Sequence, residues 1–349
     1  MDEHAGEGRN AHPLHAGERI WRESNCYIDL WIGLLSHLGL DPHAMLACTA
    51  TPQFEGDQWT FCKPTASELA LLYGIRVEEL TIWRSVREHV ATQVGKGRVV
   101  LVEVDGFHLP DTHGVTYQLE HQKTTIGIDR FDDASGTLSY FHNAGRYSVR
   151  QDDVMGLFAT GVGASSLPPF AEIADLSKVV ALDPVTLRAR SLQVLVSRLA
   201  LASSENPFLQ WSRAAESELD ALAGNALCYF HAWAFAAVRQ AGSTAELLAA
   251  WFDWFDEREE LRLASAALRE LSQTLAAQQF RLARLPSGGR RPDFAGALER
   301  CAALWETAHH TALRVASGAI DAGVALPGHA SVPVAVQHLE RATAAPPVR

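Results

Sequence analysis

The pattern of apolar residues changes near residue 165, and this change limits the folds that the chain can adopt. Before it, short β-branched runs alternate with helical patterns. After it, apolar residues recur almost everywhere at the spacing of a helix. This organisation is typical of an α+β domain followed by an all-α domain. We therefore expect a flexible tail at 1–19, an α+β domain at 20–160, a linker at 161–175, a helical domain at 176–325 and a second tail at 326–349.

Capping residues and β-branched runs predict the elements of the first half. Residues 26–38 are apolar at helical spacing and Gly39 follows as a stop. Thr65 and Glu68 form a capping-box pattern that opens a second helix. A buried strand is expected at 98–105, and two further strands at 123–129 and 137–143 are expected to form a hairpin around the turn DDASG.

The second half is expected to form helices alone. Pro207 suits the first turn of a helix, and Ser243 with Glu246 forms another capping-box pattern. The expected helices cover 185–202, 207–223, 226–240, 244–255, 257–284 and 294–318.

Composition restricts the classes of function. The 349 residues suffice for two domains, and 47% of them are apolar. The formal net charge of −11 argues against a nucleic-acid-binding protein, which would present a basic face. No apolar run reaches the roughly 20 residues of a membrane span, and the polar N-terminus lacks the apolar core of a signal peptide. We therefore expect a cytoplasmic protein with neither nucleic-acid nor membrane partners.

Cys26 differs from the other cysteines in its position. The five cysteines are odd in number, widely spaced and without a CxxC pair, so neither a disulfide framework nor a cysteine zinc site is expected. Cys26 falls in the first turn of a predicted helix, after Ser24 and Asn25, both good capping residues. The positive end of a helix lowers the pKa of a thiol, and its N–H groups could stabilise an oxyanion.

His121 and Asn143 are the residues that could activate Cys26. His121 precedes one strand of the predicted hairpin and Asn143 ends the other, so the two side chains could meet at one end of the sheet. A cysteine on a helix, a histidine opening a strand and an asparagine closing the next strand is the order of a papain-like catalytic triad. His142 is the alternative if the register differs by one residue, and Asp129 is a second candidate for orienting the base.

Each of these residues also has a purely structural interpretation. Cys26 could be a buried helix residue, His121 a strand-edge residue and Asn143 a turn residue. Polar and aromatic residues elsewhere in the first half could bind substrate or could only cap the fold: Asn25, Glu55, Asp57, Gln58, Trp59, Asp105 and His108. No metal site is expected, because the stretch VDGFHLPDTHG lacks a recognised ligand spacing.

Several segments carry a resemblance to a known family: NCYIDLWIGLLSHLGLDP (25–42), FEGDQWTFCKP (54–64), LYGIRVEEL (72–80), LVEVDGFHLPDT (101–112), HQKTTIGID and YFHNAGRY (121–147), CYFHAWAFAAVRQAG (228–242) and QQFRLAR (278–284). The chain resembles the bacterial family called domain of unknown function 1839 over roughly 20–320. Residues 25–145 are more distantly similar to the N-terminal domain of the butirosin biosynthesis acyltransferase, a papain-like enzyme that moves an aminoacyl group from an acyl carrier protein to an amine.

The resemblance implies a papain-like fold with Cys26, His121 and Asn143 as its triad. That family usually has Asp at the position of Asn143, while papain itself uses Asn. The glutamine that often precedes the nucleophile is missing here, and Asn25 or Gln58 could replace it.

The expected function is acyl transfer through a thioester on Cys26. The acyl donor would be an acyl or aminoacyl carrier protein with its phosphopantetheine arm, and the acceptor a small-molecule amine. No bound cofactor is expected. A carrier could dock on the basic residues of one segment, namely Arg76, Arg84, Arg87, Lys96 and Arg98. The alternatives are a cysteine peptidase or amidase with the same triad, and a catalytically inactive binding protein of the same fold.

Overall fold

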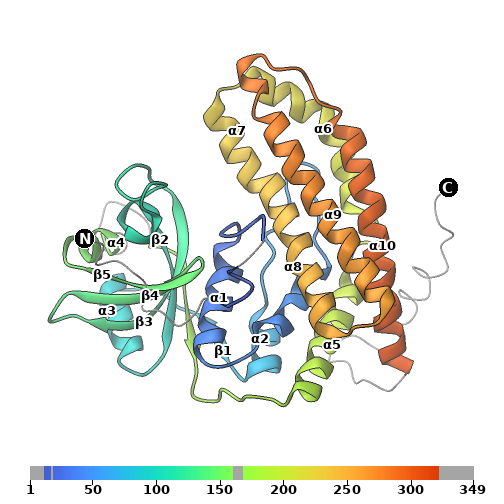
Figure 1. The fold of residues 1–349 in the computed structure, drawn as a ribbon. Coiled ribbons are helices and arrows are strands. Elements are labelled where there is room, and N and C mark those ends of the chain that lie inside the picture. Colours follow the sequence, from blue (N-terminus) through green and yellow to red (C-terminus); the bar gives the residue numbers. More distant parts are fainter. Residues whose placement is uncertain (1–11, 17–18, 160–167, 322–349) are drawn as a thin grey trace. The chain divides into compact units, whose positions relative to one another are not determined.

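The computed structural model describes residues 12–16, 19–159 and 168–321, and the chain divides into two compact units (Figure 1). Unit 1 contains Asn25–Pro42 and Thr65–Leu182, together with the described residues 12–16. Unit 2 contains Arg19–Ser24, His43–Pro64 and the chain from Asp183 onward. Most of the two predicted tails lies outside the described residues. Residues 12–16 form a turn in which Leu14 is buried, so this part of the first tail is packed and not free.

A six-stranded antiparallel sheet forms the centre of unit 1. Its order is β1-β6-β2-β3-β4-β5. The strands are β1 (Arg76–Glu79), β2 (Val99–Asp105), β3 (Lys123–Asp132), β4 (Thr137–His142), β5 (Gly145–Arg150) and β6 (Ala171–Asp175). The predicted α+β class is confirmed, and so are the three predicted strands that became β2, β3 and β4.

The helix α1 (Cys26–His37) covers one face of this sheet. Asn25 caps it by accepting a hydrogen bond from the backbone N–H of Ile28 at 3.1 Å. Leu30 packs into the space left by Gly127 of β3, where an added Cβ would lie only 3.2 Å from the leucine methyl groups. Further along, Gly33 lies against the ring of Phe141 on β4. Because β3 and β4 carry these contacts at paired positions, α1 runs across the strands.

The opposite face of the sheet is apolar and is covered by short helices. Its core joins β2, β3 and β4 to α3 (Val86–Val94) and α4 (Asp152–Leu157), and includes Val90, Val102 and Ile126. Two 3-10 turns, η2 (Gly106–His108) and η3 (Pro110–Thr112), follow β2. The helix α2 (Ala66–Tyr73) has the predicted capping box of Thr65 and Glu68.

The predicted linker is wrong in its second half. Residues 171–175 form β6, which pairs with β1 on one side and β2 on the other. The Gly, Ser and Pro that suggest a linker lie before this strand, and residues 160–167 are outside the described part. Sequence pattern also missed β1, β5 and α3. Of these, β1 pairs with the distant β6, whereas β5 pairs with its chain neighbour β4 and α3 begins with a capping box of Ser85 and Glu88.

Unit 2 consists mainly of helices, as predicted. They are α5 (Pro184–Leu201), α6 (Pro207–Gly224), α7 (Leu227–Ala234), α8 (Gln240–Phe255), α9 (Glu259–Leu282) and α10 (Phe294–Asp321), with a π-helical turn at Phe235–Arg239 between α7 and α8. The helix α9 packs against both α8 and α10, and α6 packs against α10 (Figure 1). Among the described residues, no helix combines the length and apolar character that a membrane span requires.

The segment 43–64 belongs to unit 2, although it was expected in the first domain. It includes most of the 3-10 helix η1 (Pro42–Ala50). The hydroxyl of Ser191 on α5 donates to the carbonyl of Ala44 at 2.7 Å. Trp59 packs at 5.4 Å from Trp211 and at 5.0 Å from Phe208 on α6, measured between ring centroids. These long-range aromatic contacts hold the segment against the helices.

A second short segment, 19–24, is bound to α8 and α9 of unit 2. The indole of Trp21 donates to the hydroxyl of Ser272 at 2.9 Å, and the side-chain amide of Gln240 donates to the carbonyl of Ser24 at 2.5 Å. The indole lies directly over Gly242, where an added Cβ would be 2.3 Å from the ring.

Gly242→Ala should therefore displace Trp21 and destabilise unit 2. We expect a loss of about 1–3 kcal/mol in the free energy of unfolding, measured by urea denaturation, because overpacking a rigid ring forces backbone shifts. Gly318→Ala in α10 is the matched control, since nothing lies within 4 Å of its added Cβ. That control should gain up to about 1 kcal/mol from helix propensity. Equal effects of the two variants would contradict the predicted clash.

Glu218 on α6 gives unit 2 a pH-dependent stability. Burial raises the pKa of this carboxyl to about 7, while its bond from the indole of Trp211, at 2.8 Å, works in the opposite direction. Between the ordinary carboxyl pKa and about 7, the folded state holds a proton that the unfolded state has lost. Stability must then fall as the pH rises through this range.

We expect Glu218→Gln to remove this slope, which is at most about 1.4 kcal/mol per pH unit. The measurement is the free energy of unfolding at a series of pH values from about 4.5 to about 7.5. Glu299→Gln, at an exposed position on α10, serves as the control and should keep the wild-type slope. If the pH dependence of the free energy of unfolding persists in Glu218→Gln, another titrating group causes it.

Candidate functional site

Cys26 is the first residue of α1, as predicted. Its side chain is half-buried, and within the described residues no hydrogen bond or ion pair engages the thiol. Asn25 uses its side-chain oxygen to cap the helix. The thiol lies at the N-terminal end of the helix, where the first backbone N–H groups have no acceptor within the helix.

His121 is held by a carboxylate from the neighbouring strand. Its Nδ1 lies 2.5 Å from Oδ2 of Asp105, the last residue of β2. The ring stacks on Phe107 with centroids 4.6 Å apart. The imidazole is 74% exposed and the Asp105 side chain 32%, so Nε2 is accessible to a substrate.

Asp105 is itself fixed by the backbone. Its Oδ1 accepts hydrogen bonds from the N–H groups of Phe107 at 3.0 Å and Gln122 at 3.2 Å. Partial burial opposes ionisation, yet the bonds from His121 and from these N–H groups lower the pKa of Asp105 below its ordinary value. The carboxylate therefore stays ionised and keeps the proton of the imidazole on Nδ1.

The Asp105–His121 pair lies on the face of the sheet that α1 covers. Leu101 pairs with Gly127, which faces α1, and side chains on one face recur every second residue. Glu103 and Asp105 therefore share that face. However, Asp105 lies four residues along β2 from the row that α1 crosses, which is about 13 Å at about 3.3 Å per residue. No hydrogen bond joins Cys26 to His121 within the described residues.

Asn143 does not contact His121. It follows the last residue of β4 and lies in the turn to β5, with a φ of 46°. In the strand register Asn143 lies level with Thr125 of β3, whereas His121 comes before Lys123, the first residue of that strand. His121 is thus bonded to Asp105, and Asn143 is a turn residue. For Asn143 this is the structural interpretation that the sequence also allowed. The sequence did contain a signal for Asp105 as the partner of His121, because Asp105 ends the strand next to the one that His121 precedes. β2 and β3 pair in register from Asp105 to Lys123.

His142 belongs to a separate, buried network on the opposite face. Its Nδ1 lies 2.7 Å from Oδ2 of Asp111, and its Nε2 lies 2.9 Å from the hydroxyl of Thr124. Tyr140 donates to Oδ1 of the same Asp111 at 2.5 Å. The side chains of His142 and Asp111 are only 2% and 1% exposed. This network connects η3 to β3 and β4 and has little access to a substrate.

The remaining predicted residues lie in different surroundings, some packed and some exposed. His108 packs on Phe107 and against Gly156 of α4, and Asp129 is bound by Arg146 at 3.0 Å. Glu55, Asp57 and Gln58 are exposed residues of unit 2, whereas Trp59 is buried among aromatic rings and is a core residue.

The predicted basic docking segment is largely neutralised. Arg76 and Arg98 both bind Asp175, at 3.0 and 3.5 Å, and Arg87 binds Asp133 at 2.6 Å. These arginines therefore offer less net positive charge to a carrier protein than the sequence suggested.

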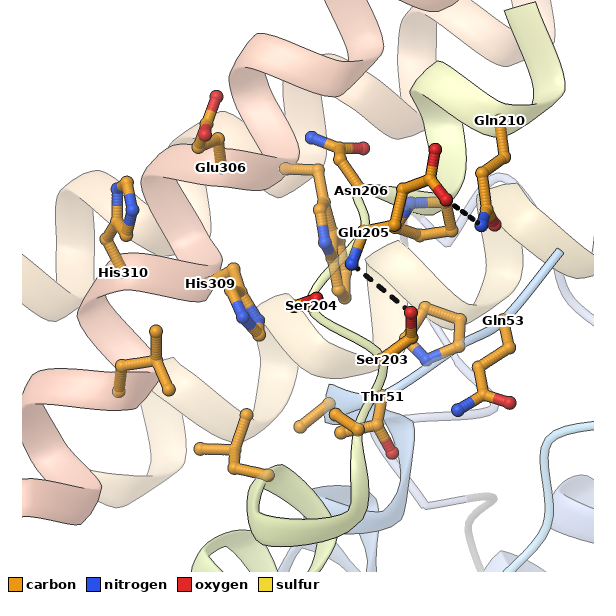
Figure 2. A pocket seen from close by; sticks show the side chains of 17 residues that line it. Thr51, Gln53, Ser203, Ser204, Glu205, Asn206, Gln210, Glu306, His309 and His310 are labelled. Carbon is orange, nitrogen blue, oxygen red and sulfur yellow. Dashed lines mark hydrogen bonds between the residues drawn. The ribbon is translucent and has the colours of Figure 1, made fainter. Parts of the chain in front are cut away.

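Unit 2 contains a pocket of about 410 Å³ between η1, the end of α5, the start of α6 and α10 (Figure 2). Its lining includes polar residues such as Thr51, Gln53 and Ser203 and apolar residues such as Leu199 and Leu313. Nothing in the sequence indicated it, because four separate segments form it.

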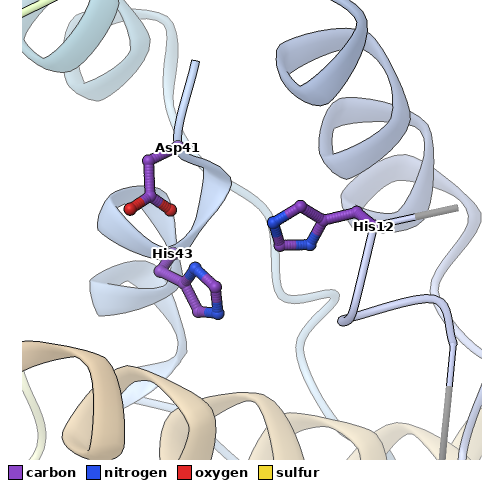
Figure 3. A group of neighbouring side chains, drawn as sticks. All are labelled: His12, Asp41 and His43. Atoms are coloured by element: carbon purple, nitrogen blue, oxygen red, sulfur yellow. The ribbon is translucent and has the colours of Figure 1, made fainter. Parts of the chain in front are cut away.

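Side chains of metal-ligating type also occur at the start of the described chain. Figure 3 shows His12 and Asp41, which belong to unit 1, and His43, which belongs to unit 2. The boundary between the two units falls between Asp41 and His43, so the three side chains do not form a metal site within one unit.

Unit 1 is an antiparallel sheet covered by a helix, with a thiol at the N-terminus of that helix. Unit 2 is helical, and the two units together make an α+β protein. Residues 10–176 match the model of the DUF1839 N-terminal domain, and residues 185–314 match that of the DUF1839 C-terminal domain. The chain therefore belongs to the DUF1839 family, which confirms the resemblance found in the sequence. No curated protein matches the chain.

The two Asp–His pairs of unit 1 should differ sharply in their effect on stability. His142→Ala leaves the buried Asp111 carboxylate without its partner and should cost about 3–5 kcal/mol. His121→Ala removes an exposed pair and should cost about 0–1 kcal/mol. Urea unfolding of both variants measures the difference. Similar losses would show that His121 is also a structural residue.

Proposed function

We propose that this protein is a cysteine-dependent acyltransferase with a papain-like first unit. Cys26 is the nucleophile, His121 is the base and Asp105 takes the orienting role that the sequence gave to Asn143. The observation that carries the proposal is the contact of 2.5 Å between Asp105 and His121, with the imidazole exposed on the sheet face that α1 covers. Cys26 at the N-terminus of that helix supplies the thiol.

The reaction has two steps. His121 Nε2 takes the proton of the Cys26 thiol, and the thiolate attacks the carbonyl carbon of an acyl thioester. The carbon–sulfur bond to the donor breaks, and the donor thiolate receives the proton from the imidazolium. An amine then attacks the acyl-Cys26 carbonyl, loses a proton to His121 and forms an amide, while Cys26 regains its proton.

The donor is proposed to be an acyl or aminoacyl group on the phosphopantetheine arm of a carrier protein. A thioester has a good leaving group, so the first step requires less acid catalysis than amide cleavage. The backbone N–H groups at the start of α1 are the candidates for stabilising the oxyanion in place of a glutamine. If water replaces the amine, the same residues perform the hydrolase reaction.

The proposal requires Cys26 Sγ and His121 Nε2 to approach within hydrogen-bond distance when substrate binds. Because Asp105 lies about 13 Å along β2 from the row that α1 crosses, this approach requires a movement of the segment that follows β2 and not only the shortening of a hydrogen bond. Asp105 acts earlier, by presenting a single tautomer of the imidazole to the thiol.

Glycyl-S-N-acetylcysteamine, a short thioester that mimics the carrier arm, tests the proposal. We expect intact-protein mass spectrometry to detect a glycyl adduct that peptide mapping assigns to Cys26. Asp105→Asn should form it about 10–100-fold more slowly, because the orienting carboxylate is lost. Asn143→Ala should form it at the wild-type rate.

Two controls separate this chemistry from general thiol reactivity. Cys26→Ala should lose the adduct, and Cys228→Ser, which removes an exposed cysteine of unit 2, should keep it. Adding an amine such as glycinamide should then release the glycyl group as an amide. Labelling spread equally over Cys26 and Cys228, or an unchanged rate in Asp105→Asn, would disprove the assignment.

A further inference from the structure

The pocket of unit 2 is lined in part by acidic residues and by no lysine or arginine. The acidic residues are Glu205 and Glu306. Figure 2 shows Glu306, His309 and His310 on α10, opposite the connection that contains Ser203 and Glu205. An anionic ligand would therefore meet the carboxylate of Glu306 without a lysine or arginine in the lining to compensate it.

The helix ends at the pocket favour the same sign of ligand. The C-terminal turn of α5 contributes Leu199 and Ala202, and the carbonyl groups at a helix C-terminus carry partial negative charge. The guanidinium of Arg198 in this turn is directed to the carbonyl of Lys63, at 2.9 Å.

The N-terminus of α6 is also at the pocket, but its donors are occupied. Pro207 has no N–H, and the N–H of Phe208 donates to the side chain of Asn206 at 3.0 Å. The N–H groups of Leu209 and Gln210 donate to the carbonyl of Asn206. The first turn thus has no donor left for a phosphate or carboxylate.

The two carboxylates differ in their availability. Glu205 accepts a hydrogen bond from Gln210 at 2.8 Å and is also bound by Arg213. Glu306 has no hydrogen-bond or ion-pair partner within the described part of the chain, so it is the stronger candidate for a cationic group.

Two histidines line the pocket, and one of them, His309, does not oppose a cation. The ring of His309 stacks on Trp305 with centroids 6.1 Å apart, and burial, followed by the neighbouring His310, lowers the pKa of His309 to about 4. The imidazole is therefore neutral near pH 7. Trp305, Leu199 and Leu313 provide an apolar wall beside these polar groups.

We propose that this pocket binds a small aliphatic amine in its protonated form, with Glu306 as the partner of the ammonium group and the apolar wall against the methylene chain. A volume of about 410 Å³ falls in the range of small-molecule sites. The proposal does not depend on the acyl transfer proposed above, because all of its residues lie in unit 2.

Isothermal titration of the full-length protein with three compounds of equal chain length tests this site. The compounds are 1,4-diaminobutane, 1,4-butanediol and succinate, at about pH 8, where an imidazole of ordinary pKa is neutral and an alkylamine is charged. We expect the diamine to bind and the diol and succinate not to bind.

Three variants connect binding to the pocket. Glu306→Gln should weaken diamine binding about tenfold or more, because a bond to a charged group is lost. Ala202→Leu should abolish binding by filling the pocket. Glu299→Gln, an exposed carboxylate of α10 outside the pocket, should bind like the wild type.

Unfolding curves of each variant verify that the helices remain folded. Failure of the diamine to bind, equal binding of the diol or succinate, or equal affinity of Glu306→Gln and Glu299→Gln would overturn the proposal.

Discussion

The close packing of α1 on the sheet is the contact on which the first unit depends. Leu30 reaches the backbone of β3 only because Gly127 has no side chain there, and an added Cβ would lie 3.2 Å from its methyl groups. The same helix packs on Phe141 through Gly33 and bonds Glu172 of β6 through Tyr27 at 2.8 Å. These three contacts fall on one row of paired strands, so they fix both the direction of the helix and the position of Cys26 at its start.

The two faces of that sheet give similar pairs of residues different properties. Asp111 and His142 lie on the face opposite α1, are almost fully buried and are further hydrogen-bonded to Tyr140 and Thr124. Asp105 and His121 lie on the α1 face at the end of β2, where Nε2 stays accessible. Burial, and not residue type, therefore separates a structural Asp–His pair from one that could act on a substrate.

The second unit collects segments that are far apart in the chain. Residues 43–64 join the helices through Trp59 and Ala44, and residues 19–24 join them through Trp21. Aromatic rings carry much of this contact, because each buries a large apolar area, and the indole N–H of Trp21 also donates to the hydroxyl of Ser272. The pocket of this unit exists only because η1, α5, α6 and α10 meet.

The sequence by itself determined the elements whose signals are local. The caps Asn25 and Thr65, Gly39 with its positive φ just after α1, and the β-branched run of β2 each act within a few residues, and the helical spacing of the second half does the same. The candidate nucleophile Cys26 and candidate base His121 were also recognised from their places at the start of a helix and of a strand. Only the tertiary structure decided that Asp105 and not Asn143 holds His121, that residues 171–175 form a central strand, and that residues 43–64 pack with the helices. Strand register and long-range aromatic packing decide these features, and both depend on residues that are distant in the chain.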